Sequence, residues 1–415
     1  MGFRFIVLLM VAVLAAPGCT RRHCVPESIA SDRNLVDLGA SPDSHAPVES
    51  GITREVEAEF RRRVAARHPA GARPYQFLAL SGGGMYGAFG VGVLKGWTDT
   101  GTRPQFDVVT GISTGSIIST FAFLGSHHDD LLKVNMSNIR RQDILQTRSA
   151  FYIPFADAVY NSRPLARRIA EEITDEILAE VAVAHAAGRR LYIGTTNLDT
   201  QRLVMWDMGA IASRGTCESA ELYRRIILAS CSIPGVFPPV RIQVEIDGQQ
   251  FDELHVDGGV SDEVIFRAFM VSDLNRTGGM PGAYAPNGSM LHVIGNGKLY
   301  SEPKCIDPVL TKMMSASFRS IIYGKTRDEL YRIYLNCLQT GVEFRLTAVP
   351  QKFRLDNTGG LSLSEADQMN LFTEGYRIGK QVEVVGDDWR DLPPGSDSVE
   401  QAMPRTGIKF ATPRK

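Results

Sequence analysis

The sequence has few cysteines and almost no excess charge of either sign. Its six cysteines are spread over 415 residues without C-x-x-C spacing, so we expect neither a disulfide scaffold nor a metal site, and no motif calls for a cofactor. Lysine and arginine number 45 against 46 acidic residues. The chain therefore has no excess of positive charge that would attract nucleic acid, and we expect no nucleic-acid partner. Any membrane contact must then depend on apolar surface or an anchor.

Other absences narrow the class of protein further. No internal repeat is visible, and the glycine-rich turn at residues 82–84 lacks the Lys-Ser/Thr ending of a nucleotide-binding P-loop. Hydrophobic residues make up 44% and charged residues 22% of the chain, which is ordinary globular composition. Pairing of Cys217 with Cys231, or of Cys305 with Cys337, is compatible with an oxidising compartment, but the sequence does not assign it.

The first residues have the pattern of an export signal. Arg4 is followed by an unbroken apolar run from Phe5 to Ala16, which is too short for a comfortable membrane span and fits a signal h-region. With Cys19 placed where cleavage is expected, residues 1–18 resemble a bacterial lipoprotein signal, although Ala16 and Pro17 depart from the usual residues. We expect an exported protein of the cell envelope, lipid-anchored at Cys19; the alternative is a plain cleaved signal and a secreted protein.

The remaining chain divides by composition into three parts. Residues 19–70 are expected to form a tether that ends in a short charged helix, 71–385 a folded domain, and 386–415 a polar tail. Within the domain, buried strand patterns alternate with helical patterns, and residues 311–341 form a long late helical stretch. This alternation predicts an α/β fold with a mostly parallel central sheet, helices on both faces, and functional loops at the ends of strands.

The stretch "GISTG", residues 111–115, has the G-x-S-x-G pattern. A strand-like run precedes it and an apolar helix-like run follows, as required for a serine held on a sharp strand-to-helix turn. The pattern makes Ser113 a candidate nucleophile. The alternative is a glycine-bounded helix start with Ser113 near the cap.

Gly82, Gly83 and Gly84 follow another strand-like run. Consecutive backbone N–H groups without side chains can bind the oxygen anion that develops during acyl transfer. A plain strand-to-helix corner is the alternative. The later Gly90 and Gly92 are expected to let the following helix pack closely against the sheet.

A serine nucleophile needs a base within hydrogen-bond reach. Asp257 in "VDGG" ends a strand-like run and precedes two glycines, which leave space for Ser113 and a substrate. An aspartate with an ordinary pKa of about 3.9 is a weak base, so partial burial would help it. His255 and His292 are rival candidates.

Six motifs occur in the same order as in a known family: "SGGGMYGAFGVGVLKG", "GISTGSIIS", "VYNSRPLARRI", "TTNLDT", "ASCSIPGVFPPV" and "VDGGV". Through them, residues 75–261 resemble the patatin-like phospholipases, which use a Ser-Asp dyad. The resemblance implies that Ser113 is the nucleophile and Asp257 its base. It also implies an oxyanion hole formed by the backbone around four glycines, Gly82, Gly83, Gly84 and Gly87.

The chain departs from the family at one position of the glycine loop. Tyr86 stands where a lysine or arginine is usual two residues after the triplet, which puts reaction rate or acyl preference in doubt without removing the backbone donors. We interpret Asp199 in "NLDT" as structural. The aromatic stretch 149–160, and similarly residues 313–322, is either a lid or membrane-facing surface, or core packing.

The leading hypothesis is a serine lipid acyl hydrolase, resembling phospholipase A or lysophospholipase, that acts on phospholipid or another lipid ester at a membrane surface. It would form an acyl-enzyme on Ser113. One alternative is an α/β-hydrolase with a Ser-His-Asp triad completed by His292. The other is a lipoprotein that binds lipid or a partner without turnover, which the changed residue at Tyr86 keeps open.

Overall fold

The computed structural model describes residues 72–137, 139–148, 156–246, 248–279, 282–300, 306–355, 363–386 and 388–394. The predicted signal peptide, Cys19 and the tether lie outside these residues, as do most of the predicted lid at 149–160 and most of the predicted tail. No helix within the described ranges is long and apolar enough to cross a membrane.

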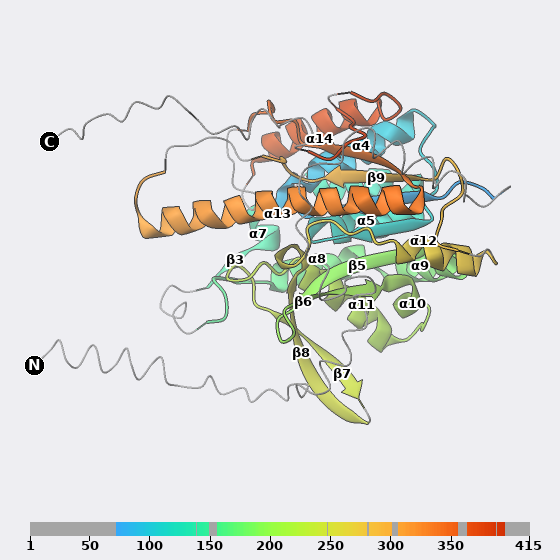
Figure 1. Cartoon of the computed structure of the whole chain (residues 1–415). Helices are drawn as coiled ribbons and strands as arrows, with labels where there is room; N and C mark the ends of the chain where they lie inside the picture. Colours follow the sequence, from blue (N-terminus) through green and yellow to red (C-terminus); the bar gives the residue numbers. More distant parts are fainter. Residues whose placement is uncertain are drawn as a thin grey trace, which may run out of the picture.

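A mixed eight-stranded sheet lies at the centre of the molecule (Figure 1). Its order is β10-β9-β1-β2-β5-β8-β7, with β6 paired to β5. The strands from β10 to β5 are parallel, whereas β6, β7 and β8 pair antiparallel with their neighbours. Their bounds are β1 Gln76–Leu80, β2 Val108–Gly111, β5 Arg190–Asn197, β6 Arg202–Asp207, β7 Val240–Ile246, β8 Gln249–Asp257, β9 Met290–Gly295 and β10 Glu343–Ala348; a separate pair is formed by β3 Gln146–Thr147 and β4 Tyr160–Asn161.

Helices cover both faces of the sheet, as the alternating pattern predicts. The α-helices are α4 Gly87–Asp99, α5 Thr114–Leu124, α6 Asp129–Ser137, α7 Arg141–Ile144, α8 Arg163–Glu172, α9 Asp175–Ala186, α10 Met208–Ala212, α11 Cys217–Ser230, α12 Phe269–Thr277, α13 Leu310–Thr340 and α14 Glu365–Gly379. Three short 3₁₀ turns matter below: η2 Gly84–Tyr86, η3 Ser126–His128 and η5 Gly258–Val260.

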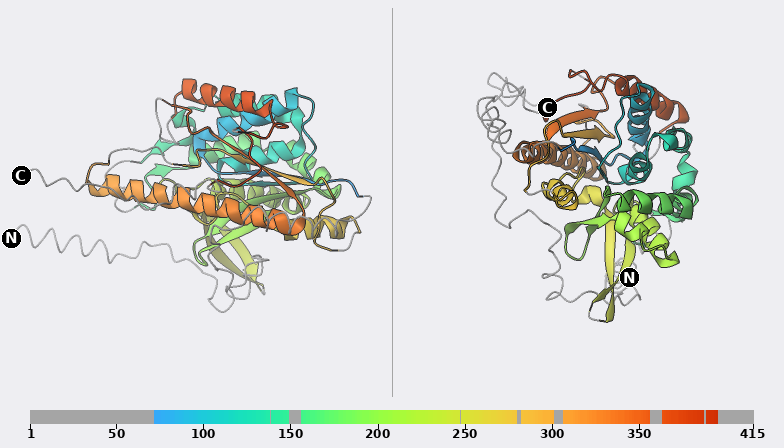
Figure 2. Two further views of the ribbon diagram at one scale, coloured as in Figure 1. Left: turned by 45° about the horizontal axis from the view of Figure 1, so that its top comes forward. Right: turned by 90° about the vertical axis from the view of Figure 1, so that its right-hand side faces the viewer.

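The period-2 alternation of the strands separates two hydrophobic cores. Leu78 and Leu80 of β1 belong to the core shared with α4, α5, α9, α11 and α14. Phe77 and Ala79 belong to the core shared with α12 and the second half of α13. The left view in Figure 2 shows the first half of α13 reaching past the end of the sheet.

Helices α4 and α14 pack unusually closely because both carry glycines at the contact. A Cβ at Gly92 or Gly96 would lie 2.1 Å from a carbonyl oxygen of α14, and one at Gly375 or Gly379 would lie 2.1 Å from a carbonyl oxygen of α4. The sequence prediction of a close approach at Gly92 is therefore correct, but its partner is α14 and not the sheet.

The structure moves the predicted C-terminal boundary and decides against one of the two cysteine pairings that the sequence left open. Trp389 is fully buried and its indole N–H donates to the carbonyl of Ile378, so the folded body extends past the predicted boundary at residue 385. Cys217 and Cys231 are both free thiols. They lie at opposite ends of α11, whose 14 residues span about 21 Å, too far for a disulfide.

Candidate active site

Ser113 lies on a strained turn between β2 and α5. Its φ is 51° and its ψ is −125°, an arrangement that costs a residue with a side chain about 1–3 kcal/mol. The flanking glycines permit the turn: a Cβ at Gly111 would lie 2.4 Å from the carbonyl oxygen of Gly115, and one at Gly115 would lie 2.5 Å from that of Leu80. The structure therefore confirms the sharp strand-to-helix turn that the G-x-S-x-G pattern predicts.

The backbone of this turn is held from the neighbouring elements. The amide of Ser113 donates to the hydroxyl of Ser230 at 2.9 Å, and that hydroxyl donates to the carbonyl of Gly194 at 2.8 Å. Because Ser230 ends α11 and Gly194 lies in β5, two elements fix the position of Ser113 before any substrate binds.

The sheet brings Asp257 to Ser113 by placing two strands end to end. Both β2 and β6 pair with residues 192–193 of β5, so they lie on opposite edges of it. Both β8 and β6 pair with residues 195–197, so β8 lies on the same edge as β2. Since β2 and β8 run in opposite directions along this edge, the last residues of the two strands face each other.

The two side chains meet at this junction. The Ser113 Oγ donates a hydrogen bond to Asp257 Oδ2 at 2.7 Å, and the amide of Gly259 donates to Asp257 Oδ1 at 2.8 Å. Burial raises the pKa of Asp257 to about 6, against the hydrogen bonds from Ser113 and Gly259 and the charge of Lys325, which lower it. This direction is the one that makes an aspartate a better base.

The glycine triplet lines the same cavity as Ser113, and Gly82 lies close to the serine. A Cβ at Gly82 would lie 3.1 Å from the Ser113 Cβ, and one at Gly83, where φ is 155°, would lie 1.8 Å from the carbonyl oxygen of Asn296. In the part of the chain that the structure describes, the amides of Gly82, Gly83 and Gly84 have no hydrogen-bond acceptor. These backbone donors are thus available beside the serine.

Gly87 differs from the other three glycines of the predicted oxyanion hole. Its amide donates to the carbonyls of Gly84 and Met85 within the turn. A Cβ at Gly87 would lie 2.8 Å from Thr114 Oγ1. In this geometry Gly87 has no free amide to offer, and its lack of a side chain allows the η2 turn to approach α5.

The two rival bases lie elsewhere. His255 is buried between Thr195, 2.9 Å from its Nδ1, and Glu253, 3.2 Å from its Nε2. His292 packs against Trp97 in the core, with ring centroids 4.5 Å apart, and burial and the charge of Arg345 lower its pKa to about 3. The hydroxyl of Ser113 donates to Asp257 while His292 lies in β9 against Trp97, so this geometry does not favour a triad completed by His292.

Asp199 has a structural contact, as the sequence interpretation expects. Its Oδ2 accepts a hydrogen bond from the amide of Leu254 at 3.1 Å, and its own amide donates to Asn197 Oδ1 at 2.8 Å. The first bond joins the turn after β5 to β8, the strand that carries Asp257, and the second holds the turn itself.

A cavity of about 830 Å³ opens over the serine. Its polar end contains the Ser113 and Asp257 side chains and the glycine triplet, and Tyr86 also lines it. Its apolar lining comes from several elements and includes Ile233, Val260, Leu299, Ile306, Phe318 and Ile322. The lining also includes Lys298 and Arg319. A cavity that combines the serine with many apolar side chains suits an ester attached to a hydrocarbon chain.

The sequence patterns did not predict one carboxyl group that lines this cavity. Glu263 lies between the two glycine turns, because a Cβ at Gly82 would be 2.9 Å from its Oε2 and a Cβ at Gly259 would be 2.6 Å from its Oε1. Burial, with the nearby charges of Asp257 and Glu329, raises the pKa of Glu263 to about 8. Glu263 is only six residues after Asp257 in the sequence. This spacing does not predict that the chain turns back and places Glu263 in the same cavity.

Lys325 is a second residue, near Asp257, whose role the sequence patterns did not predict. From α13, its Nζ donates to the carbonyl of Gly259 at 3.0 Å and to that of Val260 at 2.9 Å, and it lies 3.4 Å from Glu329 Oε1. It thus fastens the η5 turn, which follows Asp257, to α13. A lysine that is distant in sequence gives no local pattern for this role.

Part of the chain matches a model of a known protein family. Residues 78–270 match the family model of the patatin-like phospholipases. The matched segment includes Ser113, Asp257 and Glu263. It begins within β1 and ends within α12.

Two individual proteins are similar to this chain over part of their length. A stretch of 128 residues is 33% identical to the uncharacterized protein R571 of Acanthamoeba polyphaga mimivirus, covering 30% of this chain and 43% of the viral protein. The crystal structure of VipD from Legionella pneumophila aligns with a TM-score of 0.32 at 10% identity, covering 75% of this chain and 67% of VipD.

The sheet order and the helices on both faces give the mixed, mostly parallel α/β fold that the patatin resemblance implies.

Proposed function

We propose that this protein is a serine carboxylic-ester hydrolase that cleaves acyl chains from phospholipid or another lipid ester, by a mechanism like that of phospholipase A or a lysophospholipase. The observation that carries the proposal is the hydrogen bond of 2.7 Å from Ser113 Oγ to Asp257 Oδ2, made by a serine in a strained turn. A serine activated directly by a carboxylate needs no histidine.

The reaction begins when Asp257 accepts the hydroxyl proton and Ser113 Oγ attacks the ester carbonyl carbon. The carbonyl oxygen becomes an anion, which the amides of Gly82, Gly83 and Gly84 stabilise. As the intermediate collapses, the carbon–oxygen ester bond breaks and the leaving alcohol takes the proton from Asp257. The acyl group then remains on Ser113 as an ester.

Hydrolysis of the acyl-enzyme reverses these roles. Asp257 accepts a proton from water, whose oxygen attacks the acyl carbon, and the second oxyanion forms at the same glycine amides. Collapse of this intermediate breaks the bond to Ser113 Oγ, which regains its proton from Asp257. The carboxylic acid leaves, and the enzyme returns to its starting state.

An apolar surface that continues from the cavity supports a lipid substrate. The first half of α13 exposes large apolar side chains, among them Leu310, which is 71% exposed, and Met314, which is 64% exposed. Phe318 and Ile322 of the same helix line the cavity that contains Ser113. We infer that this end of α13 contacts the lipid surface from which a substrate chain enters.

The export signal and the anchor at Cys19 remain a proposal based on the sequence. We propose that the protein is held in the cell envelope by a lipid on Cys19, which would keep it beside its substrate. Metabolic labelling with a radioactive fatty acid is expected to label the wild-type chain and not the C19A variant. Release of unlabelled wild-type protein into the medium would favour the plain cleaved signal.

A fluorophosphonate probe tests the central proposal. The full chain is expected to react with the probe at Ser113, mapped by mass spectrometry, and to release fatty acid from a panel of phospholipids, lysophospholipids and neutral esters. The S113A variant, with an unchanged circular dichroism spectrum, should do neither. If the folded wild-type protein is not labelled and releases no fatty acid, the alternative of a lipid-binding protein without turnover replaces this one.

A further inference from the structure

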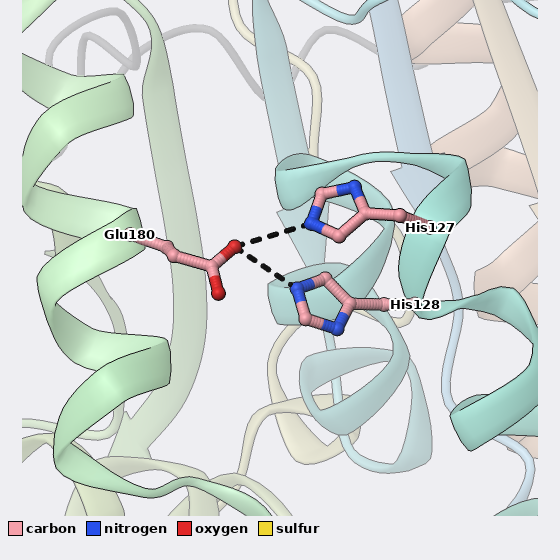
Figure 3. A group of neighbouring side chains, drawn as sticks. All are labelled: His127, His128 and Glu180. Carbon is pink, nitrogen blue, oxygen red and sulfur yellow. Dashed lines mark hydrogen bonds and ion pairs between the residues drawn. The ribbon is translucent and has the colours of Figure 1, made fainter.

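A group of side chains far from the serine has the composition of a metal site. His127 and His128 of η3 and Glu180 of α9 point toward one another (Figure 3). His127 Nε2 lies 3.2 Å and His128 Nε2 lies 3.0 Å from the same Glu180 oxygen, Oε2. All three ligand atoms lie within 4.8 Å of one another.

Two consecutive histidines of η3 bring their rings together, although both lie in one helical turn. In a helical turn, neighbouring residues point in directions that differ by 100° or more, roughly. Here Gly125 ends α5 with a φ of 133°, which a residue with a side chain rarely adopts. In the η3 turn that follows, the two imidazoles nevertheless lie close together, with ring centroids 4.1 Å apart.

The distances suit a small transition-metal ion. In a tetrahedral zinc site, bonds of about 2.0–2.2 Å place neighbouring ligand atoms about 3.3–3.5 Å apart. The spacings of 3.2 Å and 3.0 Å are within a few tenths of an ångström of that value. Two imidazoles and one carboxylate also form the nitrogen and oxygen ligand set that zinc accepts, whereas calcium and magnesium prefer oxygen alone.

The surroundings leave one coordination position open to solvent while holding one ligand firmly. His127 is exposed over 61% of its side chain, and His128 over 12%. The ring of His128 packs edge-on against Phe121 of α5, with centroids 5.7 Å apart. A bound ion would therefore have three protein ligands and water in the fourth position.

We propose that His127, His128 and Glu180 bind one zinc-class divalent ion that joins η3 to α9. Helix α5 has 11 residues, so the site lies about 17 Å from the end of the helix that carries Ser113. The ion takes no part in ester cleavage at that distance. It stabilises the contact between α9 and the far end of α5. The sequence expectation of no metal site came from cysteine spacing, which does not detect ligands drawn from separate helices.

Zinc titration of the full chain, expressed without a polyhistidine tag, tests the proposal by isothermal titration calorimetry. We expect one Zn²⁺ per chain, and an affinity at least about tenfold lower in E180Q and H128Q. If H128Q fails to fold, E180Q still tests the proposal. Glu180 is at the surface, so its substitution should leave the fold intact. E176Q, at another exposed glutamate of α9, is the matched control and should bind zinc as the wild type does.

Two further measurements separate a built site from adventitious binding. Zinc should raise the wild-type unfolding temperature and leave that of E180Q unchanged, because an ion that binds the folded state stabilises it. Co²⁺ in place of zinc should give the visible absorption of a tetrahedral site. Equal zinc affinity in wild type and E180Q, or no binding at 1 mM zinc, roughly the limit of a weak site, would overturn the proposal. Labelling of Ser113 in the same samples would show that the proposed hydrolase function survives that outcome.

Discussion

The dyad and the first half of α13 line the same cavity but have opposite surroundings. Ser113 and Asp257 are polar and buried, and each has a defined hydrogen-bond partner. Leu310, Met314 and Ile321 are apolar and exposed. Each region departs from the usual distribution of polar and apolar groups, and each departure is costly unless something else compensates for it.

In the proposed mechanism, the two departures serve one reaction. Burial of Asp257 raises its pKa and makes it a stronger base. Exposure of the α13 side chains leaves an apolar surface at the entrance to the same cavity. A polar centre reached over an apolar surface is what cleavage of a lipid ester requires. Substitutions that restore the ordinary distribution in either region should therefore reduce activity in different ways.

The largest expected effect is loss of the dyad. S113A and D257N should each lower kcat/KM on a soluble ester by about a thousandfold or more, because the nucleophile or its base is removed. Circular dichroism and the unfolding temperature should show that both variants fold. D252N, on the same strand β8, is the control and should keep full activity. A D257N variant with activity near that of wild type would refute the Ser-Asp mechanism.

Blocking the glycine turn should have the next largest effect. The Cβ of alanine in G82A would lie 2.9 Å from Glu263 Oε2 and 3.1 Å from the Ser113 Cβ. We expect kcat to fall by about 100-fold to 1,000-fold, as when an oxyanion donor is lost. G297A is the matched control, because Gly297 lines the same cavity and a Cβ there would meet nothing within 4 Å. Equal loss in both variants would argue against a specific role of Gly82.

The pH profile should distinguish the two carboxyl groups of the cavity. Below pH 6, Asp257 is protonated and cannot accept the serine proton, so kcat/KM should fall about tenfold per pH unit. Above pH 8, Glu263 ionises and places a negative charge beside the oxyanion amides, which should also lower the rate. The groups around Glu263 are Asp257, Asp262 and Glu329, which oppose its ionisation, and Lys325, which favours it.

E263Q is designed to remove only the alkaline decline. Glutamine has a similar shape and no ionisable carboxyl group, so the variant should stay active above pH 8 while the decline below pH 6 remains. The difference from wild type at pH 9 should be roughly tenfold, one pH unit above the pKa. An unchanged alkaline limb in E263Q would show that another group controls it.

The smallest expected effect concerns α13. The double variant L310Q/M314Q should hydrolyse phospholipid vesicles several-fold more slowly, about threefold to tenfold, since apolar contact with the lipid surface is lost. Its rate on a short soluble ester should stay unchanged, because neither residue lines the cavity. V183Q, at a 71% exposed valine of α9, is the control. Equal slowing on both substrates would indicate damage to the fold and not to a lipid-contacting surface.

Local sequence patterns determined the turns of this protein. The tight turns at Ser113 and at residues 82–84 could be predicted from their glycines, because only glycine fits such close backbone approaches. The long helix at residues 311–341 was readable because its pattern is continuous, and the structure confirms it as α13. Alternating strands and helices gave the α/β fold. Each of these features depends on residues that are near one another in the chain.

The tertiary structure alone decided which distant groups meet. Ser113 and Asp257 touch because β2 and β8 share one edge of β5 from opposite directions, and strand direction is not written in either segment. The packing of distant segments also places Glu263 and Lys325 beside Asp257 and buries His292. It likewise brings His127 and His128 of η3 to Glu180 of α9. A local pattern specifies how a segment bends, but contacts between segments follow from packing of the whole sheet and its helices.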